Sequence, residues 1–309
     1  MTIVNAHAHM IDLPGMVQKY GDIPLPAGIS VLQDIEAVLP LLAPETLMAQ
    51  MDEAGIDKTI LYAVEAPIVY ASNEYVHALC SACPDRLIGL ASVDPKQDNA
   101  TSVLEAAVRD LGLKGLKLHP PLQDFFPNDE AVFPLYEKAV ELDIPVVFHV
   151  GTTPFGSACR LSQASPLLID DVAVRFPELR ILLTHLGTLW HNEAFMLVEK
   201  NPNVYIDTAA YVGEIRNVLT PDMITRIGPD KIIFGTDYPM PYAGQPHRMK
   251  DFVDCIKSLG LSEEILGGIF HENVSGLLNG RPDAGPGTTA RELMEKLGVP
   301  PQGTPAKPG

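Results

Sequence analysis

The sequence is poor in basic residues, and this limits the partners that the protein can have. Its 309 residues include 22 lysines and arginines against 39 aspartates and glutamates, which gives a net charge of −17. A surface this acidic repels nucleic acid and anionic membranes, so we expect neither as a partner. It also repels anionic substrates at long range, so a carboxylate substrate needs cationic side chains close to its binding site.

Cysteines and long apolar stretches are also scarce. Four cysteines do not make a disulfide framework in a chain of this length. Cys80 and Cys83 form a C-x-x-C pair, but no second pair is spaced to complete a zinc site, so we interpret them as small residues of a helix that ends before Pro84. The chain shows no basic segment followed by a long apolar run, and no apolar run reaches membrane-spanning length. We therefore expect a cytoplasmic protein.

The sequence does contain a regular alternation of β-branched runs and helical patterns. Eight runs are expected to be strands: Ile3–Ala6, Thr59–Val64, Leu87–Val93, Gly115–Leu118, Val146–Val150, Ile181–Thr184, Val204–Asp207 and Lys231–Gly235. Amphipathic stretches lie between them, among them Thr46–Ala54, Ala100–Leu111, Ala131–Leu142, Ser165–Phe176 and Glu193–Lys200. Eight such parallel units most simply close into a (β/α)8 TIM barrel, slightly distorted by its insertions. An open doubly wound sheet is the alternative, but no glycine fingerprint of a dinucleotide fold follows the first strand.

Two regions fall outside this repeat. Residues Ile11–Ala43 contain four prolines and are predicted to form a long loop over the barrel, with a short helix near Val31–Leu39. Residues 281–309 are rich in proline and glycine, with a possible short helix at Ala290–Leu297. We predict a barrel domain over residues 1–280 and a C-terminal extension over 281–309. The extension is interpreted as a surface segment or as a packing arm for another subunit of a homodimer or larger homo-oligomer.

Groups that can bind a metal or move a proton follow the predicted strands. They are His7 and His9 at the first strand, Lys117 and His119 at the fourth, His149 at the fifth, His185 at the sixth and Asp237 at the eighth. In barrel enzymes the active site lies at the C-terminal ends of the strands, so all seven groups are expected at one end of one barrel.

The pair His7 and His9 predicts a metal site. Residues two apart on a strand point to the same face, so both imidazoles can reach one cation inside the barrel. Neutral imidazole and carboxylate suit zinc, iron, manganese or cobalt. A surface strand with two polar residues is the alternative for the pair alone, but His149, His185 and Asp237 each close another predicted strand, which favours the metal.

The motifs together resemble the amidohydrolase superfamily. They are His7-Ala8-His9, Phe148-His149-Val150-Gly151, Thr184-His185-Leu186-Gly187 and Phe234-Gly235-Thr236-Asp237-Tyr238-Pro239. More narrowly, the set is similar to the amidohydrolase-related branch, which holds aminocarboxymuconate-semialdehyde decarboxylase, γ-resorcylate decarboxylase and hydrolases of lactones and amides. The resemblance implies that His7, His9, His149 and Asp237 bind one divalent metal, for which we expect zinc, with manganese, iron and cobalt as alternatives.

The same resemblance gives two residues a catalytic role. His185 is expected beside the metal as a general base or as a donor to the developing oxyanion. Asp237 is expected to ligate the metal and also to accept a proton from a metal-bound water. A satisfied structural histidine is the alternative for His185.

Further residues are candidates for binding a small-molecule substrate. These candidates are Lys117, His119, Arg160, Trp190, His191 and Tyr211. Lys117 is expected to point into the barrel, where a buried ammonium needs a partner. That partner is either a substrate carboxylate or CO₂, which would make a carboxylated lysine that bridges two metals, as in dihydroorotase-like relatives.

The motifs predict an enzyme but leave its reaction open. Our first expectation is a mononuclear hydrolase that uses a metal-activated water on a small lactone, ester or amide that carries a carboxylate. The first alternative is a non-oxidative decarboxylase of a carboxylated aromatic or muconate, because the same ligands serve both reactions. The second alternative is a binuclear hydrolase with carboxylated Lys117. A non-catalytic metal-binding barrel would not need His185 beside the ligands.

Overall fold

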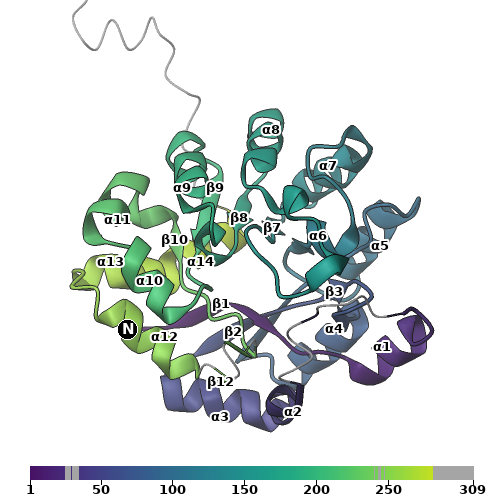
Figure 1. Cartoon of the computed structure of the whole chain (residues 1–309), viewed down its shortest axis with the longest axis horizontal. Coiled ribbons are helices and arrows are strands. Elements are labelled where there is room, and N and C mark those ends of the chain that lie inside the picture. Colours follow the sequence, from purple (N-terminus) through teal and green to yellow (C-terminus); the bar gives the residue numbers. More distant parts are fainter. Residues whose placement is uncertain (25–28, 30–34, 240, 243–244, 247, 281–309) are drawn as a thin grey trace, which may run out of the picture. The chain divides into compact units, whose positions relative to one another are not determined.

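The structure is a computed structural model that describes residues 1–24, 29, 35–239, 241–242, 245–246 and 248–280. Parallel strands form its centre, and helices lie around them (Figure 1). The strands are β1 (Val4–His9), β2 (Lys58–Tyr62), β5 (Leu87–Leu90), β6 (Leu116–Leu118), β7 (Val146–Phe148), β8 (Ile181–Leu183), β9 (Val204–Asp207) and β10 (Ile232–Ile233). The predicted barrel is confirmed.

The strands pair in two groups that close on each other. One sheet has the order β1-β2-β5 and the other the order β10-β9-β8-β7-β6. A parallel bridge between Ala91 and Leu116 joins β5 to β6. The backbone N–H of Ala6 donates to the carbonyl of Phe234, and Ala8 bridges Tyr238, so β1 meets the segment after β10. Within the described residues, these contacts close the two sheets into one barrel.

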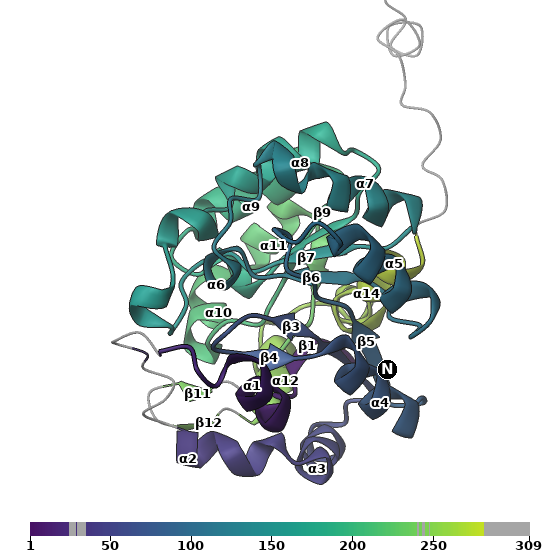
Figure 2. The same ribbon diagram turned by 90° about the vertical axis from the view of Figure 1, so that its right-hand side faces the viewer.

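Helices cover the outside of the strands. In Figure 2, α7, α8 and α9 lie on one side of the strands and α3 on the opposite side. The covering helices are α3 (Pro44–Ala54), α4 (Asn73–Ala82), α5 (Ala100–Arg109), α7 (Phe133–Glu141), α8 (Leu167–Arg175), α9 (His191–Lys200), α11 (Pro221–Ile227) and α12 (Met249–Lys257). Shorter helices are α2 (Ile35–Val38), α6 (Pro120–Gln123), α10 (Val212–Val218), α13 (Glu263–Gly267) and α14 (Asn273–Asn279). None of the helices in the described part of the chain is long and apolar enough to cross a bilayer.

The strand register decides which side chains face the barrel interior. Lys117 of β6 pairs with Val147 of β7, which pairs with Leu182 of β8 and then Tyr205 of β9. The last three side chains belong to one buried apolar cluster inside the barrel. Their neighbours in sequence belong to the cluster under the helices. Because side chains alternate along a strand, Lys117 lies in the interior row, as the sequence predicts.

The segment after the first strand differs from the expected loop. An eight-residue helix, α1 (Leu13–Tyr20), begins directly after β1 and the turn at Asp12. The Asp12 carboxylate accepts from the backbone N–H of Gly15, and Pro14 stands in the first turn, where proline has no hydrogen bond to lose. The predicted helix near Val31–Leu39 lies partly outside the described residues; within them, α2 is followed by a 3₁₀ turn at Leu39–Leu42.

Other elements also begin or end at residues different from those predicted. The run Thr59–Val64 divides into β2 and a short strand, β3 (Val64–Glu65), which pairs antiparallel with β4 (Tyr70–Ala71). A second small hairpin pairs β11 (Pro241–Tyr242) with β12 (Gln245–Pro246). The compact unit of the barrel spans Met1–Asn279. Residues 281–309, with the predicted helix at Ala290–Leu297, lie outside the described residues, so the two-part division remains a prediction.

Candidate metal centre and active site

The polar groups predicted from the strand ends do gather at one end of the barrel. His7 and His9 belong to β1, and Lys117 to β6. His149 directly follows β7, His185 follows β8 by two residues, and Asp237 lies after β10. The C-terminal ends of parallel strands lie at the same end of the barrel. This brings together residues as far as 230 positions apart in the sequence.

Three of these groups converge closely enough to share a cation. The Nε2 atoms of His7 and His9 are 3.2 Å apart. The Asp237 Oδ1 atom is 3.2 Å from the first nitrogen and 3.5 Å from the second. Donor atoms held about 2.1 Å from a zinc-like ion in tetrahedral geometry lie about 3.4 Å from one another, so this spacing fits a metal. We call His7, His9 and Asp237 the metal trio.

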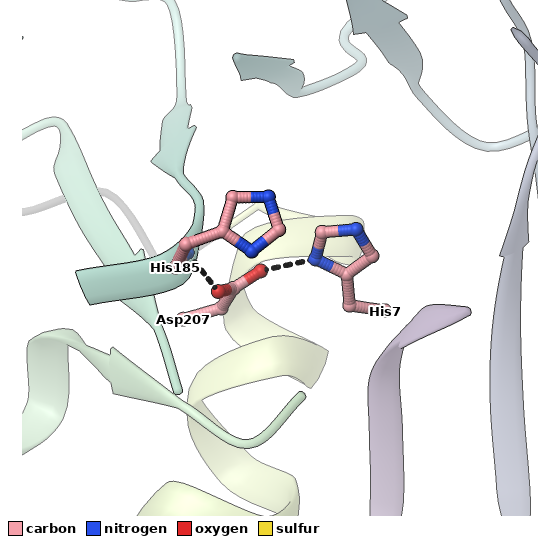
Figure 3. Close-up of side chains that lie close together, drawn as sticks. All are labelled: His7, His185 and Asp207. Carbon is pink, nitrogen blue, oxygen red and sulfur yellow. Dashed lines mark hydrogen bonds and ion pairs between the residues drawn. The ribbon is translucent and has the colours of Figure 1, made fainter. Parts of the chain in front are cut away.

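A buried carboxylate that the sequence interpretation missed supports the trio. Asp207, at the end of β9, is fully buried, and its Oδ2 atom accepts a 2.7 Å hydrogen bond from His7 Nδ1 (Figure 3). Its Oδ1 atom accepts from the backbone N–H groups of His185, at 2.7 Å, and Ala209, at 3.0 Å. Because the proton of His7 is held at Nδ1, its Nε2 lone pair faces His9 and Asp237, as a metal ligand requires.

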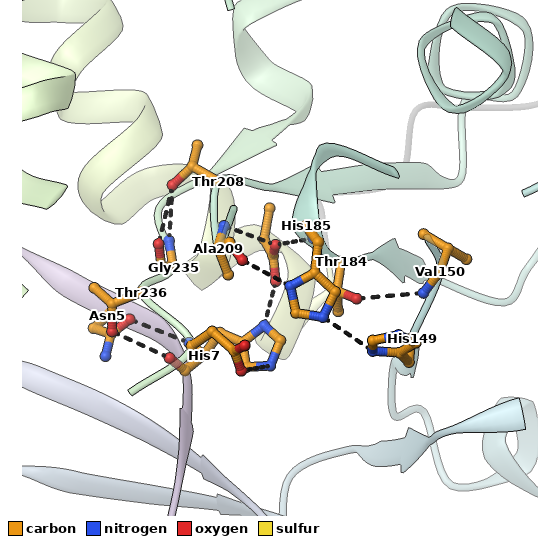
Figure 4. Close-up of polar contacts among 12 residues, drawn as sticks. Asn5, His7, His149, Val150, Thr184, His185, Thr208, Ala209, Gly235 and Thr236 are labelled. Carbon is orange, nitrogen blue, oxygen red and sulfur yellow. Dashed lines mark hydrogen bonds and ion pairs between the residues drawn. The ribbon is translucent and has the colours of Figure 1, made fainter. Parts of the chain in front are cut away.

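The predicted fourth ligand, His149, is oriented by a chain of hydrogen bonds (Figure 4). His185 Nδ1 donates to the Ala209 carbonyl at 2.7 Å, which leaves its Nε2 atom as an acceptor. That atom lies 3.0 Å from His149 Nδ1, which therefore carries the proton. The lone pair of His149 is then on Nε2, a buried atom with no hydrogen-bond partner among the described residues. Ligation by His149 remains a prediction, because it is not in the close group that the trio forms.

The backbone around the site holds conformations that side chains rarely adopt. The φ angles of His185 and Asp237 are 62° and 54°, which cost about 1–3 kcal/mol each outside glycine. Gly235 lets β10 approach β1, since a Cβ atom there would lie 3.0 Å from the Cβ of His7. Such strain persists only where the surroundings impose it, and it is common at active sites.

The charges around the site shift the pKa values of its histidines in different directions. Burial acts to lower the pKa of His7, but the carboxylates of Asp207 and Asp237 outweigh it and raise that pKa. Burial lowers the pKa of His9 to about 4. Burial, together with nearby cationic groups, holds the pKa of His119 and of His149 well below the ordinary value. Burial tends to raise the pKa of Asp237, yet the neighbouring imidazoles keep it well below its ordinary range. The site thus offers neutral imidazoles at His9 and His149 and an ionised carboxylate at Asp237, the forms that bind a metal.

A two-lobed cavity opens beside the trio. One lobe is lined by His149, His185, Asp237 and Tyr211, among others. The second lobe shares the first three and adds His9, Lys117, His119 and apolar side chains. The apolar lining of the second lobe is Ile11, Val64, Val69, Leu122, Pro154, Phe155 and Pro239.

The family model for the amidohydrolases matches residues 4–275, most of the chain. The protein belongs to the amidohydrolase family. It is similar to γ-resorcylate decarboxylase from Polaromonas sp., at 27% identity with 61% of this chain and 74% of that protein covered. It is equally similar, at 27% identity with 68% and 71% covered, to 2-keto-4-carboxy-3-hexenedioate hydratase from Sphingobium sp..

A solved structure shares the fold of this amidohydrolase. It is 5-carboxyvanillate decarboxylase from Novosphingobium aromaticivorans, complexed with manganese and a nitrobenzoic acid. The TM-score is 0.67 at 19% identity, and the match covers 90% of this chain and 95% of that one. The family prediction is confirmed. Hydrolysis and zinc are not, because these relatives are named for decarboxylation and hydration and the solved neighbour holds manganese.

The metal expected of an amidohydrolase fits the residues present. Two imidazole nitrogens that approach each other at 3.2 Å with a carboxylate oxygen beside them are compatible with a shared cation. A second close group, His7 with His185 and Asp207, is already hydrogen-bonded within itself. We interpret Asp207 and His185 as residues that hold His7 in place for the metal trio, and not as a second metal site.

Three of the six predicted substrate-binding residues of this amidohydrolase line the cavity, and three do not. Lys117 and His119 line the second lobe and Tyr211 the first. Arg160, Trp190 and His191 line neither lobe. The Arg160 side chain is 71% exposed beside Asp124, and His191 pairs with Glu214 at 2.8 Å. Arg160 and His191 therefore have partners of their own outside the lining of both lobes.

Proposed function

We propose that this amidohydrolase is a metal-dependent decarboxylase, which removes CO₂ from a small carboxylated aromatic or muconate without an oxidant. The observation that carries the proposal is the second lobe, where a buried ammonium, Lys117, shares an apolar-walled cavity with the ionised Asp237 and with His9 of the metal trio. Relatives named as decarboxylases of such acids support it.

The reaction needs three things from the site. The C–C bond to the carboxylate breaks, its electron pair stays on the substrate carbon, and a proton then replaces CO₂ on that carbon. When bound, a divalent cation supplies a fixed positive charge that orients the substrate and stabilises developing negative charge. The apolar wall disfavours the ionised carboxylate and favours neutral CO₂, so burial itself promotes the bond cleavage.

His185 and Asp237 are the groups placed to pass on to that carbon a proton taken from solvent. Both line both lobes, so either side chain reaches a substrate bound across them. Burial lowers the pKa of His185, although Asp237 opposes that effect. Nδ1 of His185 is committed to the Ala209 carbonyl, so the ring can exchange a proton with substrate only at Nε2, which would have to give up its hydrogen bond from His149 Nδ1.

Hydrolysis of a lactone, ester or amide is the second candidate. The observation that favours it is the neutral imidazole of His185 next to Asp237, because an unprotonated imidazole is what removal of a proton from water requires. A binuclear form with carboxylated Lys117 is the third candidate. We propose one divalent ion per chain, zinc or manganese.

The purified enzyme, loaded with one metal at a time, tests the proposal on paired panels of carboxylated phenols and lactones. Metal content is measured on the same samples. Release of CO₂ with deuterium from D₂O incorporated at the vacated carbon supports the decarboxylase. Release of acid from lactones without CO₂ would instead establish the hydrolase, and two metal equivalents that depend on bicarbonate would establish the binuclear form.

A further inference from the structure

Lys117 is a buried cation without a hydrogen-bond partner. Its side chain is 1% exposed, and Nζ makes no hydrogen bond within the described part of the chain. The Lys117 ammonium lies over the ring of Tyr62, whose centroid is 5.1 Å from Nζ. A cation–π contact of this kind does not satisfy the three N–H donors of the ammonium. An unpaired buried ammonium is costly, so its donors are expected to meet an acceptor that the chain does not supply.

His119 presents a second donor to the same lobe. The backbone N–H of Leu122 donates to its Nδ1 atom at 3.2 Å, so the imidazole proton is on Nε2. Its ring stacks on that of His149, with centroids 3.8 Å apart and planes 11° apart. The Gln123 side-chain oxygen also accepts from the His119 backbone N–H at 2.8 Å. These contacts fix the ring and its tautomer before any ligand arrives.

The rest of this lobe offers little to an anion. Apart from the imidazoles and Asp237, its lining among the described residues is apolar. Asp237 faces His7 and His9, at 3.2 and 3.5 Å, and is engaged by the metal trio. A substrate group that reaches Lys117 and His119 therefore finds donors from both side chains.

We infer that Lys117 and His119 form a subsite for a second anionic oxygen of the substrate, distinct from the carboxylate that is lost. The oxygen belongs either to an ionised hydroxyl or to a second carboxylate, since both accept hydrogen bonds from an ammonium and an imidazole N–H. The inference rests on the proposed function, because it names the class of acid that the site takes: one with two anionic oxygen groups rather than one.

Ligand binding tests this inference without turnover. Calorimetry on the metal-loaded enzyme compares benzoate, 2-hydroxybenzoate and benzene-1,2-dicarboxylate. We expect one of the last two to bind about 10-fold or more tightly than benzoate, as a charge-assisted hydrogen bond contributes. A preference for 2-hydroxybenzoate identifies a hydroxyl oxygen as the group bound, and a preference for the dicarboxylate identifies the second carboxylate. Equal affinity for all three overturns the inference with no variant needed.

Matched variants assign the preference to residues. Lys117→Met removes the charge and keeps the volume, and His119→Phe keeps a ring to stack on His149 but removes the donor. Each should abolish most of the preference while metal content stays the same. Arg160→Met removes an exposed cation and should change nothing. If Lys117→Met still prefers the acids with a second oxygen group over benzoate, the assignment is refuted. If the variants lose this preference but the wild-type enzyme releases no CO₂ from any substrate, only the proposed reaction is refuted.

Discussion

The two halves of the active site use the same residue type in opposite ways. One half, which we call the acidic half, contains His7 and His9 with Asp207 and Asp237. The other, the basic half, contains His119, His149 and His185 with Lys117, and no carboxylate hydrogen-bonds to its imidazole rings among the described residues. Imidazoles in the first half have charged partners, whereas those in the second have backbone groups and one another.

This difference separates the tasks of the site. Asp207 raises the pKa of His7 and directs its lone pair toward the trio, so the acidic half is built to hold a cation. Burial and Lys117 lower the pKa of His119 and His149, so the basic half stays neutral except for one ammonium. Close to the site, a substrate anion is attracted by that ammonium and by the bound cation. This local attraction outweighs the repulsion by the protein's net negative charge.

The largest effect is expected where the acidic half loses a ligand. Asp237→Asn removes the carboxylate that lies 3.2 Å from His7 Nε2, and an amide is a much weaker ligand. Metal content after dialysis against a chelator should fall by most of its value, and activity should drop by about 10³ or more. Plasma mass spectrometry measures the metal. Asp143→Asn, an exposed carboxylate beside Arg180, is the control and should keep both. Retained metal in Asp237→Asn would exclude the trio.

Replacement of His185 tests whether the basic half acts in chemistry rather than in binding the metal. His185→Asn should keep the metal and lower kcat by about 10², since a general acid–base group typically contributes that much. Steady-state kinetics and metal analysis are measured together. His191→Asn, an imidazole paired with Glu214 outside the cavity lining, is the matched control. Equal loss of metal and activity in His185→Asn would make His185 a ligand.

A smaller effect is expected from Asp207, which binds no metal itself. In Asp207→Asn the amide oxygen can still accept from the backbone N–H groups of His185 and Ala209, but the NH₂ group then faces His7 Nδ1. His7 would have to move its proton to Nε2, where it opposes the metal. Metal affinity should weaken about 10- to 100-fold, as for other outer-sphere carboxylates.

Competition with a chromophoric chelator measures that affinity, and ¹⁵N NMR reports the His7 tautomer. Thr208→Val is the control, because the Thr208 hydroxyl is equally buried but bonds only the backbone of Gly235. Unchanged affinity in Asp207→Asn, with the tautomer shifted, would show that orientation of His7 does not limit binding.

The sequence could predict the strand ends and therefore most of the site. Period-two alternation places His7 beside His9 and turns Lys117 inward, and both features are local. Asp207 closes a predicted strand, so its position was readable, but its partner is 200 residues away and only the closed barrel joins them. α1 was missed because Pro14 and Gly15 resemble a loop, although proline suits a first helical turn. The exposure of Arg160 depends on a segment without periodicity, which no local rule predicts.

The smallest expected effect is the pH dependence of the basic half. Burial lowers the pKa of Lys117 from an ordinary value of 10.5 to about 8, while Asp207 and Asp237 partly oppose burial. Below pH 8 the ammonium is present and can bind an anionic oxygen; above pH 8 it loses its proton. The KM for an acid with two anionic groups should therefore rise above about pH 8, by at most about tenfold per pH unit. Lys117→Met should have a higher KM that does not change in this range.

Deprotonation of Lys117 should weaken substrate binding above pH 8 but increase the stability of the fold. A change in both quantities over the same pH range distinguishes Lys117 from other titrating groups. Between pH 8 and 10.5 the unfolded chain binds a proton at Lys117 that the folded chain does not, so the free energy of unfolding gains a contribution that rises with pH in this window. Urea titrations of the wild type and of Lys117→Met measure that difference across the window. A constant difference would mean that Lys117 keeps its proton in the folded protein across this window, and the rise in KM would then need another cause.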